Sequence, residues 1–369
     1  MVSRVTRSPG GVFRRSAGGV RGGTPRPNLT SGRAHSLVSY GGYLWTLGVN
    51  TADNSPYKYD GRTYKSQSGR RWTYISEPDE LSNTDANSPR PAVSFDGYIY
   101  SMQHGVLDDF YNWKIHKTTD CENFTQVLPA GGFVKKFAGN FPAGTYSSDG
   151  EVKINEDHFS ASGSRTTACV FDGKLWFYGR FLIYKEWYTD PEYPWLPPVY
   201  HYLEEGGYCL QNIDSSGYYT FVNNSDTIGA LCAHGGNLWT AGATPPHGGT
   251  LYAAYSTNGE TWTDASDVGI DVEMNHAQTD LVSFGGNLYL FLTRYDSTEQ
   301  KIYAAVYDGA SWSEIEMQGI PWFSVGGTPF FSVTVHGDAL ALTYKDILDG
   351  DVIAHTTYVS SDGETWTRV

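Results

Sequence analysis

The acidic residues that could hydrolyse a glycosidic bond are spread over several segments that the sequence predicts to be loops. Glycosidases use two carboxyl groups about 5–9.5 Å apart, one of which is kept protonated by its surroundings. A chain with 40 Asp+Glu also carries many loop carboxylates that are simply solvated. We therefore assign no catalytic residue. The candidates are the acidic residues of the long loops: Asp108, Asp109, Glu186, Asp190, Glu192, Asp346, Asp349 and Asp351.

A second group of candidates is the aromatic cluster in residues 179–195. So many large rings are unusual in a solvated loop, so they are expected to cover something. They could bury another segment of the chain, such as residues 130–166. They could also form a protein–protein contact, where Trp and Tyr concentrate at hot spots, or a platform on which sugars stack. The predicted binding residues are Tyr184, Trp187, Tyr188, Tyr193 and Trp195.

Metal and cofactor motifs are weak. The four cysteines form no Cys-x-x-Cys pair, so buried free thiols are the simpler interpretation: Cys121, Cys169, Cys209 and Cys232. His234 and His336 each precede a Gly turn at a repeated position, which predicts a structural role. Residues 346–351 offer Asp oxygens that suit Ca²⁺, but they lack a twelve-residue loop closed by Glu. We expect no cofactor and no metal site.

The elements that position these residues belong to an internal repeat, which divides the chain after residue 34 into six units. Its first half is a Gly turn followed by an aromatic or apolar strand, at residues 42–45, 97–100, 173–176, 236–239, 286–289 and 337–340. Its second half is another turn that ends in an aromatic residue. In five units this aromatic residue lies 26 to 30 residues after the Gly of the first turn, and in the third unit it lies 46 residues after that Gly. Fixed-period similarity of this kind indicates a repeat fold.

Each unit predicts four short antiparallel strands. Gly, Asn and Asp in the links suit hairpins that require a positive φ. Six four-stranded sheets around an axis form an all-β, six-bladed β-propeller, here residues 35–369, with insertions at about 130–166 and 179–200. These two insertions flank the third unit and should be neighbours in space. The ring should close without strand exchange, because the first unit has its own first strand and Val369 ends the last strand.

The repeats resemble those of Kelch, galactose-oxidase-like and Asp-box (sialidase-type) propellers. Residues 256–262 and 360–366 match the Asp-box form Ser-x-Asp-x-Gly-x-x-Trp, but with one residue fewer between the acid and the glycine. The resemblance implies that these turns stabilise hairpins, and it says little about activity. A sialidase would also need an arginine triad and an Arg-Ile-Pro-type segment, and that tripeptide is absent.

The repeat predicts two unlike rims. The turns between first and second and between third and fourth strands are short and uniform. The opposite rim holds the long connections, which are the usual carriers of function. Those expected between second and third strands are Asn50–Arg62, His104–Asn112, Gly179–Pro198, Thr244–Gly249, Arg294–Gln300 and Lys345–Asp351.

Residues 1–34 differ in charge from the rest of the chain. The formal net charge is −14, but this segment contains no Asp, Glu or Lys, and seven Arg: Arg4, Arg7, Arg14, Arg15, Arg21, Arg26 and Arg33. Such a Gly- and Arg-rich arm has little to bury and should order only on a partner. It lacks the apolar core of a signal peptide. No apolar run in the chain approaches the ~20 residues of a membrane span.

These features favour a non-enzymatic structural and binding module of a virus or phage particle. The basic arm would dock onto other structural proteins of a homo- or hetero-oligomeric assembly, and the loop rim would contact neighbours or surface glycans. The acidic globule argues against nucleic-acid binding at the propeller. Two alternatives remain: a glycosidase or sialidase-like carbohydrate-active enzyme, and a soluble lectin or adaptor propeller.

Overall fold

The computed structural model consists of β-strands and turns, and no helix occurs among the residues it describes. Accordingly, no described segment is a helix that could span a bilayer. The described residues are 36–49, 62–76, 78, 92–107, 110–127, 133–136, 151–154, 167–180, 183–188, 199–204, 208–215, 219–224, 229–243, 251–265, 279–295, 299–320, 323–324, 331–348 and 352–369.

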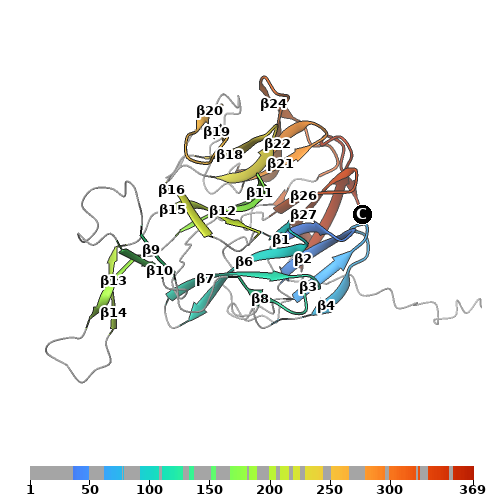
Figure 1. The fold of residues 1–369 in the computed structure, drawn as a ribbon. Coiled ribbons are helices and arrows are strands. Elements are labelled where there is room, and N and C mark those ends of the chain that lie inside the picture. The colour runs from blue at the N-terminus through green and yellow to red at the C-terminus, as the bar shows by residue number, and fades with distance from the viewer. Residues whose placement is uncertain are drawn as a thin grey trace, which may run out of the picture.

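Six four-stranded antiparallel sheets form the blades, and each uses strands from one repeat (Figure 1). Blade 1 contains β1 (Ser36–Tyr40), β2 (Tyr43–Val49), β3 (Arg62–Ser66) and β4 (Thr73–Ser76). Blade 2 contains β5 (Ala92–Phe95), β6 (Tyr98–Leu107), β7 (Phe110–Thr118) and β8 (Thr125–Gln126). Blade 3 contains β11 (Thr167–Phe171), β12 (Lys174–Arg180), β15 (Tyr208–Asp214) and β16 (Tyr219–Asn224).

The second half of the chain builds the other three blades in the same order. Blade 4 contains β17 (Ala230–His234), β18 (Asn237–Ala243), β19 (Leu251–Ser256) and β20 (Thr263–Asp264). Blade 5 contains β21 (Thr279–Phe284), β22 (Asn287–Tyr295), β23 (Glu299–Tyr307) and β24 (Trp312–Ile315), with β25 (Phe323–Ser324) added to β23. Blade 6 contains β26 (Phe331–His336), β27 (Ala339–Leu348), β28 (Val352–Ser360) and β29 (Thr367–Arg368).

The first strands of the blades form a closed inner ring. Each contacts the first strand of the next blade, from β1 through β5, β11, β17, β21 and β26 back to β1. Blades 1 and 6 each hold only strands of their own repeat. The six-bladed all-β propeller and its closure without strand exchange are therefore confirmed.

Tight turns explain why the first two strands of each blade pair in the same register. The turns are two residues long, and Gly41–Gly42, Asp96–Gly97, Asp172–Gly173, Gly235–Gly236 and Gly285–Gly286 all have positive φ at both positions. Two consecutive positive φ values define the hairpin turn that matches strand twist, which is why Gly and Asp occupy these positions. The short, uniform rim is thus as predicted.

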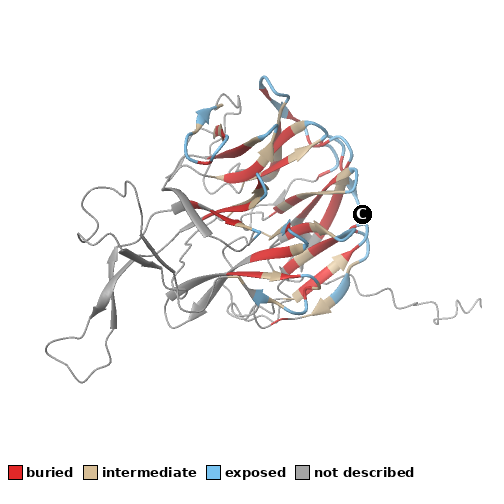
Figure 2. Cartoon of the chain, in the orientation of Figure 1, coloured by how far each residue is buried: buried red, intermediate tan, exposed pale blue. Residues whose placement is uncertain are grey.

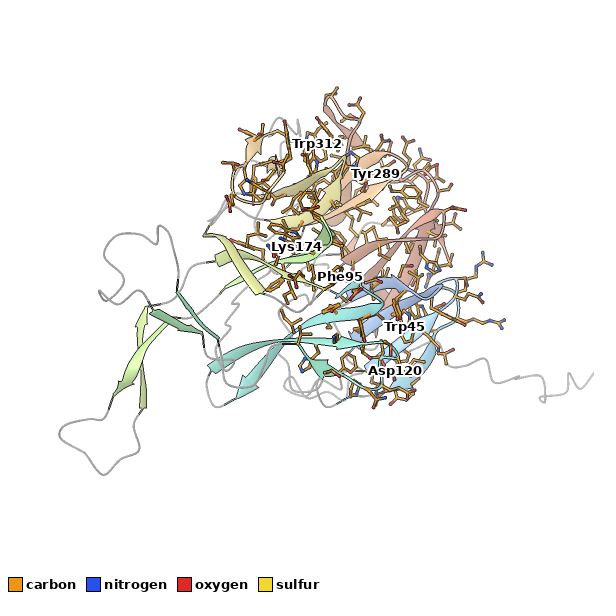
Figure 3. The ribbon with its side chains drawn as sticks, in the orientation of Figure 1. Trp45, Phe95, Asp120, Lys174, Tyr289 and Trp312 are labelled. Carbon is orange, nitrogen blue, oxygen red and sulfur yellow. The ribbon has the colours of Figure 1, made fainter. Side chains whose placement is uncertain are left out.

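The turn before the last strand has its own hydrogen-bond pattern. In blade 4, Ser256 Oγ accepts the N–H of Gly259 (2.8 Å), and Asn258 Oδ1 accepts those of Glu260 and Thr261 (2.9 and 3.1 Å). Asp362 in blade 6 and Asp120 in blade 2 accept equivalent bonds. These bonds hold the pKa of Asp120 down at about 2, because they favour the carboxylate. Figure 3 labels Asp120 at the outer part of the ring.

On the opposite rim, the described residues of three blades continue as hairpins into segments that were predicted to be loops, which corrects that part of the prediction. Residues 104–107 and 110–112, assigned to a loop, belong to β6 and β7 and pair from His104↔Trp113 to Leu107↔Phe110. In blade 6 the pairing continues to Leu348↔Val352, so that Asp346 lies in β27. Blade 5 pairs as far as Tyr295↔Gln300. In each case the pairing of the second and third strands continues along the existing hairpin.

The two insertions form one additional four-stranded sheet, called here the insertion sheet. Its order is β14-β13-β10-β9. The first insertion supplies β9 (Phe133–Lys136) and β10 (Glu151–Ile154), and the second supplies β13 (Ile183–Tyr188) and β14 (Val199–Glu204). The predicted proximity of the insertions is therefore confirmed. In Figure 1 this sheet lies apart from the ring, beside blades 2 and 3.

The core lies in the seams between blades, where buried positions cluster on the first three strands (Figure 2). An aromatic residue of the second strand anchors most seams, as Trp45, Trp176, Trp239 and Tyr289 do. In blade 6 Ala341 takes this position, and Trp72 of blade 1 packs there instead. Figure 3 labels Trp45 and Tyr289 on the second strands of blades 1 and 5.

Candidate functional site

The inner ring carries a repeated hydrogen bond between neighbouring first strands. The donor is a backbone N–H on the first strand of the following blade. The acceptor is a side-chain oxygen on the first strand of the preceding blade, and it lies four residues before the last residue of that strand. Thr167 Oγ1 accepts the N–H of Leu231 (2.9 Å), and Ser332 Oγ accepts that of Leu37 (3.1 Å). In blade 5 the acceptor at this position is Asp280. These bonds fix adjacent inner strands to one another.

Asp280 gives this position a chemistry that the other blades lack. Its Oδ2 accepts the N–H of Val333 (3.0 Å) on β26, and its Oδ1 accepts the N–H of Leu281 (3.0 Å). Burial in the seam nevertheless raises the pKa of this carboxyl to about 7, because desolvation outweighs the two hydrogen bonds that favour the charge. The residue retains some exposed surface. Asp280 is therefore a residue with some exposed surface whose buried carboxyl has a pKa near neutral pH.

The position of Asp280 along β21 places it toward the rim that holds the long connections between strands, called here the elaborated rim. The strand runs from Thr279 to Phe284 and then enters the tight turn at Gly285 on the uniform rim. Asp280 is its second residue and lies at the opposite end. Acid–base groups with displaced pKa values concentrate at functional sites. This carboxyl is accordingly the strongest candidate for chemistry among the described residues.

The cysteines near this site are not nucleophiles. Burial raises the pKa of Cys232 on β17 to about 12, and the nearby Asp280 carboxylate adds to this effect. The pKa of Cys169 on β11 is also raised, first by burial and then by Cys232. Cys121, Cys169 and Cys232 are all free thiols, as predicted. Because a thiolate is the reactive form, these thiols are inert at neutral pH.

The two histidines at repeated positions tie blades together. The Nδ1 atom of His234 lies 2.9 Å from Ser283 Oγ in blade 5, and the Nδ1 atom of His336 lies 2.9 Å from Ser39 Oγ in blade 1. Burial lowers the pKa of His234, which favours its neutral form. Both histidines thus have the predicted structural role. Within the described ranges, no three His, Cys, Asp or Glu residues group in a way that could hold a metal ion.

The predicted aromatic binding residues are only partly located. Tyr184, Trp187 and Tyr188 lie in β13 of the insertion sheet, whereas Tyr193 and Trp195 fall outside the described residues. Among the acidic candidates, Glu186 lies in β13 and Asp346 in β27. Both were assigned to loops, and both belong to strands. Two sets lie outside the described residues: the remaining acidic candidates (Asp108, Asp109, Asp190, Glu192, Asp349, Asp351) and the seven arginines of the arm.

Asp280 was not among the predicted candidates. A signal for it is present in the sequence, because aligning the six units on their tight turns places one acid at this position of the inner strand. The six residues in blade order are Ser36, Pro91, Thr167, Ala230, Asp280 and Ser332. The alignment shows that blade 5 is exceptional. Its pKa, however, depends on burial in a seam that the sequence does not reveal.

Comparison with known proteins yields structural similarity without sequence similarity. No family model matches the chain, and no curated protein matches it. Among similar solved structures, a GH43 β-xylosidase/α-arabinofuranosidase from a compost microbial metagenome has 12% identity and a TM-score of 0.43, covering 92% of this chain and 94% of that one. An exo-β-1,3-galactanase from Phanerochaete chrysosporium has 11% identity and a TM-score of 0.46, covering 88% and 76%. A GH32 β-fructofuranosidase from Bombyx mori has 11% identity and a TM-score of 0.41, covering 92% and 86%.

These comparisons correct the expected function. The similar structures are glycoside hydrolases, and the findings offer nothing in favour of a Kelch relationship or a particle component. The expectation of a non-enzymatic virion module is therefore wrong, as is the expectation that the chain is not an enzyme. At this level of similarity the substrates of those proteins say nothing about this one, and the fold itself rests on the strand order described above.

Proposed function

We propose that the protein is a carbohydrate-active enzyme of glycosidase type in which Asp280 is the proton donor. The observation that carries the proposal is the pKa of about 7 for the carboxyl of Asp280, a partly exposed residue at the elaborated end of an inner strand. A glycosidase needs one carboxyl group that is still protonated near neutral pH, so that it can protonate the leaving oxygen. Ordinary aspartates, with pKa values near 3.9, do not meet this requirement.

The proposed reaction is hydrolysis of a glycosidic bond. The carboxylic acid of Asp280 transfers its proton to the glycosidic oxygen as the bond from that oxygen to the anomeric carbon breaks. A water molecule adds to the anomeric carbon, and its proton passes to a second carboxylate. The acidic residues of the elaborated rim supply the candidates for this base. Asp346 lies on the described strand β27 of blade 6, the blade to which Asp280 is hydrogen-bonded.

The repeat itself supplies the variant that tests this role. Asp280→Thr copies Thr167 of blade 3, whose hydroxyl accepts the same inter-blade hydrogen bond without a titratable group. The assay is reducing-sugar release from xylan, arabinan, galactan and inulin. We expect the wild-type chain to hydrolyse at least one of them and Asp280→Thr to lose about 10²–10⁴-fold in kcat, the usual contribution of a general acid.

The control is the folded state of the variant. Asp280→Thr should unfold within a few degrees of the wild-type chain, so that lost turnover reflects lost chemistry. The acidic residues of the rim are then replaced by amides one at a time, beginning with Asp346→Asn, to locate the base. Wild-type turnover in folded Asp280→Thr would refute the assignment of the proton donor. Absence of hydrolysis of every substrate by the wild-type chain would refute the glycosidase itself.

A further inference from the structure

The turn between the third and fourth strands of blade 1 is opposite in charge to the equivalent turns that the structure describes in other blades. Those turns carry only acidic charges: Asp120 and Glu122 in blade 2, Glu260 in blade 4, Asp308 in blade 5, and Asp362 and Glu364 in blade 6. The turn of blade 1, residues 66–72, contains no acid. Arg70 occupies the position of the glutamates, and Arg71 follows it. Blade 1 therefore presents two positive charges between neighbouring blades that each present two negative ones.

This basic turn is held firmly against blade 6. A Cβ atom on Gly69 would come within 2.8 Å of Thr357 and 3.0 Å of Val369, so the turn packs closely on that blade. Figure 1 shows the C-terminus beside blade 1. The Nε2 atom of His336 lies 3.0 Å from the carbonyl oxygen of Gln67 and donates to it, because a carbonyl oxygen can only accept. The turn therefore presents its two arginines from an anchored backbone.

A lysine and a tyrosine extend the surface from this turn toward blade 2. Lys65 is opposite Trp45 in the pairing of β2 with β3. Its Nζ atom lies 5.2 Å from the ring centres of both Tyr43 and Trp45, so cation–π contacts hold the ammonium group against these rings. Trp45 is buried in the seam with blade 2, whereas Tyr43 is 38% exposed. A positive charge and an accessible aromatic ring thus lie together.

The four residues that carry these features share the uniform rim of blade 1. Tyr43 directly follows the tight turn between the first two strands, and residues 65–71 end the third strand and form the next turn. Both arginines are exposed and Lys65 is partly exposed. This set is called here the basic surface: Tyr43, Lys65, Arg70 and Arg71. It lies on the rim opposite to that of Asp280.

We propose that the basic surface binds a short glycan that carries carboxylate groups. Arginine forms bidentate, charge-assisted hydrogen bonds with carboxylates, and Lys65 adds a third positive charge. The Tyr43 ring offers a flat apolar surface and a hydroxyl group, which match the apolar and hydroxylated surfaces of a sugar. The negative charge of the ligand follows from these residues, whereas the choice of a sugar rests on the proposed function.

The neighbouring turns restrict the length and charge density of the ligand. A long polyanion on blade 1 would extend over the acidic turns of blade 2 or blade 6 and be repelled by them. Duplex nucleic acid, with one charge per about 1.7 Å of its axis, is therefore poorly suited. A trisaccharide of uronic acids carries three carboxylates, which equals the number of cations on the basic surface. Such a ligand would be anchored away from the rim where Asp280 lies.

The test measures binding to the full chain in the Asp280→Thr background, so that a substrate is not consumed. Isothermal titration calorimetry compares trigalacturonate with galactotriose, which has the same number of sugar rings and no carboxylate. We expect trigalacturonate to bind about tenfold more tightly or better. The double variant Arg70→Gln/Arg71→Gln should lose about tenfold or more in affinity for it, as expected for lost hydrogen bonds to charged groups. Tyr43→Ala should weaken binding about fivefold through lost apolar contact.

Two matched controls separate this surface from general effects of charge and aromatic content. Arg368→Gln removes an exposed arginine of blade 6 that is opposite Tyr358, on the face turned toward blade 5. Tyr74→Ala removes an aromatic residue of blade 1 that is 51% exposed and opposite Tyr64, on the other face of the sheet from Lys65. Both controls should bind trigalacturonate within about twofold of the parent. Thermal unfolding shows whether each variant retains the ring.

The dependence on salt gives a further readout. Because the contacts are between charges at an exposed surface, raising NaCl from about 0.05 M to about 0.5 M should weaken binding of trigalacturonate. Absence of binding, equal affinity for galactotriose, or equal losses in Arg368→Gln and the double variant would overturn the proposal. Equally tight binding of triglutamate would assign the surface to an acidic peptide instead, and tighter binding of a DNA duplex would assign it to nucleic acid.

The outcome is separable from that of the proposed function. Hydrolysis of a neutral polysaccharide by a wild-type chain that binds no trigalacturonate would retain the enzyme and remove the basic surface. Binding that requires Arg70 and Arg71, in a chain that hydrolyses no substrate, would do the reverse.

Discussion

Gly259 lies directly against the indole of Trp176 across the seam between blades 4 and 3. A Cβ atom on Gly259 would overlap this ring and come within 2.7 Å of Cη2. The indole cannot easily move, because Trp176 is buried and its Nε1–H donates to the carbonyl of Phe171 (2.9 Å). Gly363 of blade 6 has the same relation to the ring of Tyr289 in blade 5. The Asp-box-like turn is thus a packing device that fits one blade onto the aromatic residue of the preceding blade.

Replacing this glycine should strongly destabilise the protein. Gly259→Ala combines backbone strain at a φ of +79° with overlap of the indole. Overpacking of this kind costs about 1–3 kcal/mol beyond the strain. Gly309→Ala is the control, because Gly309 also has a positive φ but no atom lies within 4 Å of its Cβ position. Urea denaturation measures both variants. Equal losses of stability would mean that the turn does not depend on this contact.

Histidine and serine occur together across the inner seams. Where the residue before the tight turn is His, the facing position of the next blade is Ser: His234 faces Ser283, and His336 faces Ser39. Where it is Phe, the position in the next blade is Val or Ala. These pairs are Phe95 with Val170, Phe171 with Ala233, and Phe284 with Val335. In these five seams the two positions are therefore both polar or both apolar.

This pairing predicts a compensating double mutant. His234→Phe should cost about 1 kcal/mol, because it leaves the Ser283 hydroxyl without this partner in a seam, and Ser283→Val should cost a similar amount. The double variant reproduces the Phe–Val pair of other seams and should recover most of the loss. A double-mutant cycle by thermal unfolding measures the interaction energy. Strictly additive losses would contradict the coupling.

The ring closes between blades 6 and 1 without a strand exchanged between them, so individual hydrogen bonds there should be measurable. Ser332→Ala removes the acceptor of the Leu37 N–H and should lower stability by about 1 kcal/mol. Ser332→Thr retains a hydroxyl, as Thr167 does in blade 3, and should remain close to the wild-type chain. Thermal unfolding compares them. If both variants unfold together with the wild-type chain, the bond does not hold the closure.

The fold could be predicted from the sequence because each blade carries its own local turn signals. Tight turns that need positive φ, such as Asp172–Gly173, and the turn at Ser256–Trp262 recur at a fixed period. The strand pairing at the elaborated rim was harder to predict from the sequence. Residues 104–112 contain a glycine and two adjacent aspartates, which are loop signals, yet the hairpin of blade 2 extends through most of them. Pairing along an existing hairpin outweighs these local preferences.

The candidate site was mostly beyond prediction because it depends on contacts between distant segments. The pKa of Asp280 is raised by a seam that β26 completes some fifty residues later in the chain. The insertion sheet likewise depends on a pairing between strands of two separate insertions, Lys153 of β10 with Tyr184 of β13, whose register the sequence does not show. Tyr184, Trp187 and Tyr188 lie together in β13, and their role in binding stays a prediction.

The Asp280 carboxyl should also make stability depend on pH. In the unfolded chain its pKa returns to about 3.9, whereas in the folded protein it is about 7. Between these values the folded state holds a proton that the unfolded state has lost, so this group's contribution to stability falls as pH rises from about 4 to about 7. Above pH 7 it should be constant.

Asp280→Thr should remove this dependence while the inter-blade hydrogen bond remains. Cys232, with a pKa of about 12, stays protonated throughout this range. His234 and the turn carboxylate of Asp120 titrate in both proteins, and their effects cancel in the difference. From pH 5 to pH 8, the stability of the wild-type chain should fall by about 1 kcal/mol or more relative to Asp280→Thr, the equivalent of one pKa unit. Urea denaturation across this range gives the difference. A constant difference would mean that Asp280 titrates as an ordinary aspartate, and its suitability as a proton donor would be lost with it.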